Sequence, residues 1–79
     1  MKTRKKKDIE WYEFARITDE SGEFNQDCDV SQAEAMLRAG IIDSFDGEDD
    51  HGYCVERFYT VRQENEGAVV AWLEDHPAD

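Results

Sequence analysis

Residues 53–62, YCVERFYTVR, carry the clearest strand pattern in the chain and decide its fold class. The segment is rich in aromatic and β-branched residues, which favour the pleated, half-buried surface of a β-sheet. Successive side chains of a strand point to opposite faces. One face would carry Tyr53, Val55, Arg57, Tyr59 and Val61, and the other Cys54, Glu56, Phe58, Thr60 and Arg62.

Upstream of this strand, residues 30–40, VSQAEAMLRAG, contain the clearest local helix signal. Ser31 and Glu34 have the S-x-x-E spacing of a capping box, which satisfies free backbone amides at the start of a helix. Ala33, Met36 and Leu37 form one apolar stripe on the helix. Gly40 stands where a glycine commonly ends a helix. The segment therefore predicts a short helix.

The remaining segments alternate between strand and helix patterns. We expect strands at 9–18, 23–27 and 41–46, and a second helix at 68–76 that Pro77 stops. The odd positions of the first strand, which include Ile9, Trp11 and Ile17, make the better core face. The order ββαββα predicts a small two-layer α+β sandwich. We expect an antiparallel sheet of about four strands with both helices on one face.

The length of 79 residues allows one domain, with one thin core and no room for a deep catalytic cavity. We expect residues 1–7 to form a basic flexible tail and residues 8–79 to form the domain. No apolar run reaches the length of a membrane span, and the basic start is not followed by the apolar region of a signal peptide. A cytoplasmic protein that does not enter membranes is expected. Cys28 and Cys54 are then interpreted as reduced thiols, although a disulfide between them stays open.

Charge is distributed very unevenly along the chain. Residues 1–7 carry five basic side chains, whereas residues 8–79 carry all twenty carboxylates and only four arginines. Such a body repels nucleic acids and anionic membranes and attracts basic surfaces. The same charge is also typical of a protein that is acidic only for solubility. The basic tail could contact nucleic acid, fold back on the body or serve solubility.

The densest acidic stretch is DSFDGEDDHG, residues 43–52. The GEDDHG part is interpreted as a solvated hairpin loop, since charge is easily tolerated in loops. A calcium loop that begins at Asp46 would require glycine at its sixth position and glutamate at its twelfth. The chain has His51 and Arg57 there, so the spacing disfavours calcium.

Other site chemistries find little support in the sequence. Cys28, His51, Cys54 and His76 could supply zinc ligands, but they lack the tight pairs of structural zinc sites. The carboxylates lie in turn-like sequence, where acid/base catalysis lacks the burial that separates two pKa values. No phosphate loop, nucleophile elbow or HExxH motif is present. We therefore expect no enzyme activity, no cofactor and no metal site.

Two helices can cover only one face of the expected sheet, which leaves the even positions of strands 9–18 and 53–62 outward. Aromatic rings and arginine among polar residues resemble the composition of binding hot spots. Tyr12, Phe14 and Phe58 belong to this face. A partner or a second copy of the chain could bind there. The rings could instead be covered by the tail or by a different strand order.

These features lead to a hypothesis of an acidic, non-enzymatic binding protein that inhibits or regulates a basic, nucleic-acid-handling protein. Its carboxylates would imitate the charge of a DNA duplex. In size and charge the chain resembles the small acidic inhibitors of restriction, CRISPR and repair enzymes that phages and plasmids encode. The alternative is an interaction subunit that forms homodimers through the aromatic face. The expected partner-binding residues are Tyr12, Phe14, Phe58, Asp43, Asp46, Glu48, Asp49, Asp50, Glu20, Glu23, Asp27 and Asp29.

Overall fold

The computed structural model describes residues 12–77 and shows a small α+β fold with four strands and two α-helices. The expected tail at 1–7, and Ile9 and Trp11 of the first strand, lie outside the described residues. The order differs from the expected one in a short 3-10 helix, η1, before the last helix. The elements are β1 (Tyr12–Thr18), β2 (Asn25–Cys28), α1 (Val30–Arg38), β3 (Ser44–Asp50), β4 (Cys54–Thr60), η1 (Gln63–Asn65) and α2 (Glu66–Asp75).

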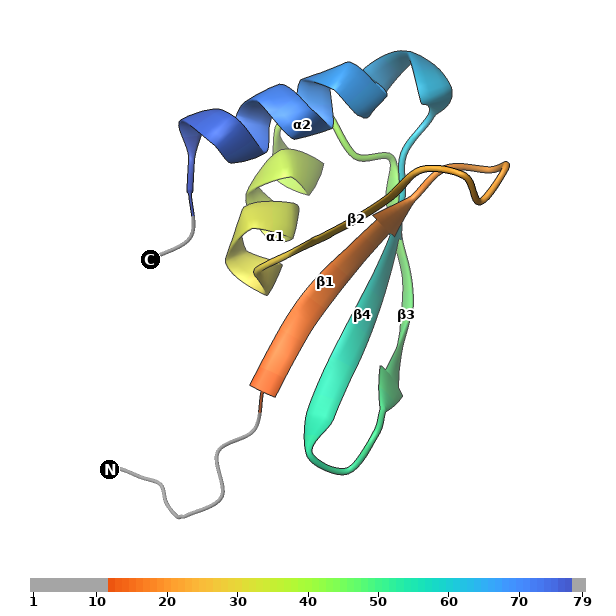
Figure 1. Ribbon diagram of the computed structural model, residues 1–79, viewed down its shortest axis with the longest axis vertical. Coiled ribbons are helices and arrows are strands. Elements are labelled where there is room, and N and C mark those ends of the chain that lie inside the picture. The colour runs from red at the N-terminus through yellow and green to blue at the C-terminus, as the bar shows by residue number, and fades with distance from the viewer. Residues whose placement is uncertain (1–11, 78–79) are drawn as a thin grey trace.

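The four strands form one mixed sheet in the order β2-β1-β4-β3 (Figure 1). The central pair β1 and β4 is parallel, while both edge pairs are antiparallel. The expectation of a purely antiparallel sheet was therefore wrong. The reason is topological: β2 and β3 lie at opposite edges, so the connection through α1 must cross the sheet and leaves β1 and β4 as neighbours. Local patterning carries no information about that neighbour relation.

The core lies between one sheet face and the helices. Ile17 of β1 and Tyr59 of β4 are Cα partners, and both are fully buried. They join Ala33 and Met36 of α1 and Val69 of α2 in one cluster. The odd positions of β1 thus form the core face within the described residues, as the alternation predicted.

The N-cap of helix α1 lies two residues before the predicted one. Asp29, not Ser31, is the N-cap residue, and its backbone N–H donates to Gln32 Oε1 at 2.9 Å. Asp-x-x-Gln gives the same end geometry as Ser-x-x-Glu, because aspartate is an equally good cap. The C-terminus matches the prediction, since Gly40 follows the C-cap Ala39 with φ +82°.

The acidic stretch is a strand and not a loop. Strand β3 continues to Asp50 and contains a bulge between Phe45 and Gly47, so the expected loop at 47–52 shrinks to a turn after Asp50. An exposed edge strand can pair with another chain, and charged side chains discourage such pairing. The carboxylates of β3 therefore protect this edge strand from pairing with another chain, a role that they would not have in a loop.

Figure 1 shows both helices gathered at one end of the sheet, while the β3-β4 hairpin and the start of β1 project beyond them. We call this part the projecting end; it comprises residues 12–14, 48–50 and 54–56. Glu13 and Asp50 are exposed there and Val55 is only partly buried. In the described residues, neither helix has the length and apolar character that a membrane crossing requires.

Candidate functional site

The sheet face opposite the helices carries the side chains that the alternation assigned to it. Tyr12 lies opposite Cys54, Phe14 opposite Glu56 and Arg16 opposite Phe58. Directly paired residues share a sheet face, so these six side chains and their edge neighbours form one surface. We call it the open face; it consists of Tyr12, Phe14, Arg16, Thr18, Asp27, Asp49, Cys54, Glu56, Phe58 and Thr60.

Aromatic rings occupy the open face at the projecting end and directly next to it. Tyr12 and Phe14 stack with ring centroids 5.8 Å apart and an interplanar angle of 23°. Tyr12 is 59% exposed, and Phe14 and Phe58 are partly buried. Tyr53 in the adjoining turn is also exposed. The rings of Tyr12 and Phe14 are thus not sealed inside the protein.

A partly buried ion pair lies among these rings, and sequence reasoning missed it. The Glu56 side chain is only 10% exposed, with Oε2 2.6 Å from Arg16 Nη1 and Oε1 3.1 Å from His51 Nε2. Arg16 also donates from Nε to Asp27 at 3.1 Å, and this hydrogen bond raises the pKa of its guanidinium. The alternation placed Arg16 and Glu56 on outward faces, but only the parallel pairing of β1 with β4 brings them together.

The expected acidic residues fall into three groups. Asp27 and Asp49 belong to the open face, and Asp46 hydrogen-bonds Thr60 at its margin. Asp29 stands beside the open face at the start of α1. The other residues lie elsewhere: Glu48 and Asp43 pair with arginines, Asp50 binds the Gly52 amide in the hairpin turn, and Glu20 and Glu23 belong to the β1-β2 turn.

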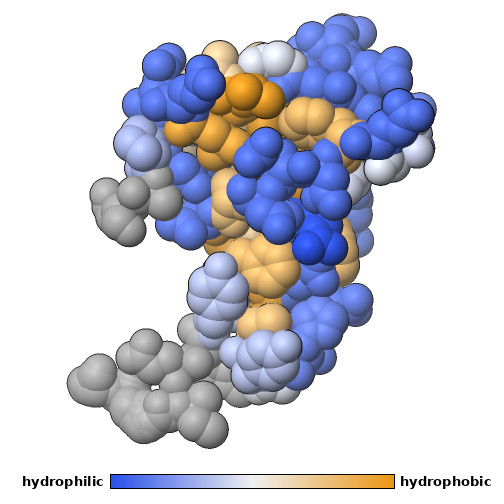
Figure 2. Space-filling model, viewed as in Figure 1, coloured by the Kyte–Doolittle hydropathy of each residue, from blue (hydrophilic) through white to orange (hydrophobic). Residues whose placement is uncertain are grey.

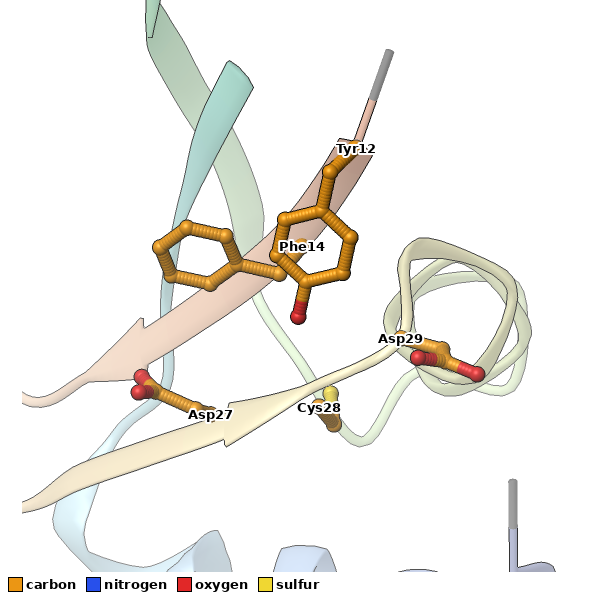
Figure 3. A pocket seen from close by; sticks show the side chains of 5 residues that line it. All are labelled: Tyr12, Phe14, Asp27, Cys28 and Asp29. Atoms are coloured by element: carbon orange, nitrogen blue, oxygen red, sulfur yellow. The ribbon is translucent and has the colours of Figure 1, made fainter. Parts of the chain in front are cut away.

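The open face adjoins an open hollow of about 400 Å³ between the start of β1 and the junction of β2 with α1 (Figure 3). A second hollow of about 460 Å³ lies at the helix-covered end. Sequence length had predicted no deep cavity; both hollows are open at the surface. The first is lined by Tyr12, Phe14, Asp27, Cys28 and Asp29, and the second by Glu20, Ser21, Gln63 and Glu64.

A carboxyl pair, Asp19 with Glu66, forms a second unpredicted feature. A hydrogen bond from Glu66 lowers the pKa of Asp19 to about 2, helped by the Ser21 hydroxyl, and the same bond raises the pKa of Glu66. Asp19 is 7% exposed and also accepts from the Gly22 amide at 2.9 Å. The two carboxyls therefore favour one shared proton between the end of β1 and the start of α2.

The candidate zinc ligands do not converge. Cys28 is opposite Ala15, whereas Cys54 is opposite Tyr12, so the two thiols lie on different sheet faces. Both cysteines are free, and burial, aided by Asp29 and Asp27, raises the pKa of Cys28 to about 11. His76 stacks on Trp72 with centroids 4.1 Å apart. Within residues 12–77 no three His, Cys, Asp or Glu side chains form a metal-sized cluster.

Comparison with known proteins yields no relative from which a function could be transferred. No protein-family model matches the chain, and neither a curated protein nor a solved structure is significantly similar to it.

Proposed function

We propose that the protein is a non-enzymatic acidic binder that inhibits or regulates a basic, nucleic-acid-handling protein, with the open face as its contact surface. The observation that carries this proposal is the placement of exposed aromatic rings between carboxylates on an anionic body. Tyr12, Phe14 and Phe58 would supply contact area. Asp27 on one edge strand and Asp49 on the other would flank the partner.

The charge balance of the described residues supports attraction of a basic partner. Residues 12–77 hold seventeen carboxylates and four arginines. Arg16, Arg57 and Arg62 are already engaged with carboxylates of the same chain. The remaining negative charge would steer a cationic protein toward the surface and accelerate association. Burial of the rings would then slow dissociation, because short-range contacts mainly determine how fast a complex separates.

Competition with nucleic acid is the mechanism that follows from this charge. A protein that binds DNA presents arginine and lysine to the phosphate backbone. Carboxylates on a folded sheet could occupy that basic surface and exclude the duplex. Monomer and homodimer are both compatible with this mechanism, provided that the open face is accessible.

The alternative is a homodimer formed through the open face, with acidity serving solubility only. Exposed Tyr12 and Tyr53 favour such an interface. The negative charge of the open face opposes such a homodimer, because Asp27 and Asp49 of two copies would approach one another as the faces met.

The test is capture of partners from the native host on the immobilised protein, followed by displacement with duplex DNA. We expect a basic nucleic-acid-binding protein that is released by high salt and by the duplex. Tyr12→Ala and Phe14→Ala should weaken capture, whereas Glu74→Gln on exposed α2 should not. Salt-independent capture, or a partner that holds DNA and this protein together, would contradict the proposal. A dimer by sedimentation that Tyr12→Ala dissociates, without affinity for basic proteins, would favour the alternative.

A further inference from the structure

Resting on the proposed function, we propose that the hollow beside Tyr12 receives an arginine side chain of the partner. The hollow lies where β2 ends at Cys28 while β1 continues to Tyr12. Figure 3 shows the phenol ring of Tyr12 over this gap, with its hydroxyl directed into it. The volume of about 400 Å³ is near the lower end of ligand sites, and its open form suits one protruding side chain of a larger partner.

The lining of the hollow combines an aromatic wall with carboxylates. Tyr12 and Phe14 stack at 23°, so they present a nearly continuous ring surface. Asp27 and Asp29 lie on the other side, separated by the half-buried Cys28. Among residues 12–77 no lysine or arginine lines the hollow, although Arg16 donates a hydrogen bond to the lining residue Asp27. A cation that entered would find both a π surface and negative charge.

The chain itself shows twice how this chemistry holds an arginine. The Arg57 guanidinium lies 4.3 Å from the ring centroid of Phe45, and its Nη1 is 2.8 Å from Glu48 Oε1. The Arg16 guanidinium lies 5.7 Å from the Phe14 centroid, and its Nε is 3.1 Å from Asp27. In both cases a ring supports the guanidinium and a carboxylate accepts its hydrogen bond. Arg16 already uses Phe14 and one oxygen of Asp27. A guanidinium from outside would therefore stack mainly on Tyr12 and pair with Asp29 or the second oxygen of Asp27.

Arginine fits this lining better than lysine does. Its guanidinium is planar, stacks on rings and donates several hydrogen bonds in one plane, whereas the lysine ammonium is compact and strongly hydrated. Cys28 does not add charge at neutral pH, because burial raises the pKa of its thiol to about 11. Asp29 therefore supplies most of the available charge, because Asp27 is already paired with Arg16, and the rings supply the preference for a planar cation.

The test is a titration of the isotope-labelled protein with the peptide acetyl-Gly-Arg-Gly-Arg-Gly-amide at low salt, followed by amide NMR. Peptides in which lysine or citrulline replaces arginine serve as controls. We expect the largest shifts at residues 27–29 and 12–14, about threefold or more weaker binding of the lysine peptide, and no binding of citrulline. Equal binding of arginine and lysine, or shifts spread over all acidic segments, would overturn the proposal.

Variants locate the site without unfolding it. Asp29→Asn removes the charge but keeps a good N-cap, so α1 should persist. Phe14→Leu removes a ring and keeps apolar volume. Each substitution should weaken binding of the arginine peptide by about three- to tenfold. Glu64→Gln, a matched loss of charge on the exposed η1 far from the hollow, should leave binding nearly unchanged. An equal loss with Glu64→Gln would show general electrostatic attraction in place of a hollow.

The two proposals can fail separately. If Asp29→Asn and Phe14→Leu leave capture of the basic partner intact while high salt abolishes it, the proposed function stands and the arginine hollow is wrong. If the peptide binds in the hollow but no basic protein is captured, the hollow stands and the proposed function is wrong.

Discussion

The two ends of the sheet are held together by different forces. At the helix-covered end, Ile17 and Tyr59 are fully buried against α1 and α2. At the projecting end neither α1 nor α2 lies over the sheet, and the Arg16–Glu56 ion pair joins the central strands at its border, near exposed Tyr12. Figure 2 shows the same division, with most of the hydrophobic surface near the helices and a hollowed flank below them.

This difference separates stability from binding. Apolar burial supplies most of the favourable free energy of a small domain, and it is concentrated at the covered end. The projecting end contributes backbone pairing and charge interactions, so its side chains are available to contact another molecule. Substitutions at the two ends should therefore affect different measurements.

The largest effect is expected for Ile17→Ala at the covered end. Loss of this fully buried side chain should lower the free energy of unfolding by about 2–5 kcal/mol, because it removes apolar burial and leaves a cavity. Urea unfolding followed by circular dichroism measures the change. In a small domain this is a large part of the total stability.

The matched change at the projecting end is Tyr12→Ala. Tyr12 is 59% exposed, so we expect a stability change within about 0.5 kcal/mol. A loss of stability comparable to that of Ile17→Ala would contradict the comparison, since it would mean that the projecting end has a hydrophobic core of its own.

An effect smaller than that of Ile17→Ala, but larger than that of Tyr12→Ala, is expected for Glu56→Gln. The carboxylate is buried between Arg16 and His51, so neutralising it leaves Asp27 as the partner of the Arg16 charge within residues 12–77. We expect a loss of about 1–3 kcal/mol, less than for a fully buried pair because Arg16 is 35% exposed. A double-mutant cycle with Arg16→Met measures the pair, and a coupling near zero would show that the pair does not stabilise the projecting end.

The smallest effect concerns the pH dependence set by Asp19 and Glu66. Glu66 has a raised pKa in the fold. Its contribution to folding stability is therefore full below about pH 4.5 and is lost as the pH rises through the raised pKa. Asp19, with its pKa near 2, contributes above about 3.8 and loses that contribution as pH falls. The contribution of this pair to wild-type stability should therefore be greatest between the pKa of Asp19 and the raised pKa of Glu66, and should decline at lower and at higher pH.

Glu66→Gln tests this pair, because its amide keeps a donor toward Asp19 and carries no charge. The variant should be more stable than wild type at pH 7, and the difference should shrink as the pH falls to about 4.5. Thermal unfolding across this pH range measures it. Glu64→Gln, an exposed neighbour, is the control and should give no such trend. A pH-independent difference would rule out a shared proton.

Prediction from the sequence worked best where local patterns were strong. The alternation in 53–62 located β4 and placed Tyr59 and Val61 on the buried face. It was less successful for β3, where residues 47–50 were interpreted as part of a loop because carboxylates disfavour strands. Pairing with β4 overrides that preference, and Arg57 accommodates Glu48 across the two strands.

The sequence alone determined the α+β composition, the helix at 30–38, the outward position of the aromatic rings and the strong negative charge of the body. These properties depend on neighbouring residues and on the 2.0 and 3.6 periodicities. Only the tertiary structure decided that β1 and β4 are parallel neighbours, that Glu56 is buried beside Arg16, and that Asp19 meets Glu66. Those contacts join segments 40 or more residues apart, and their geometry follows from the crossing of α1 over the sheet, which no local pattern encodes.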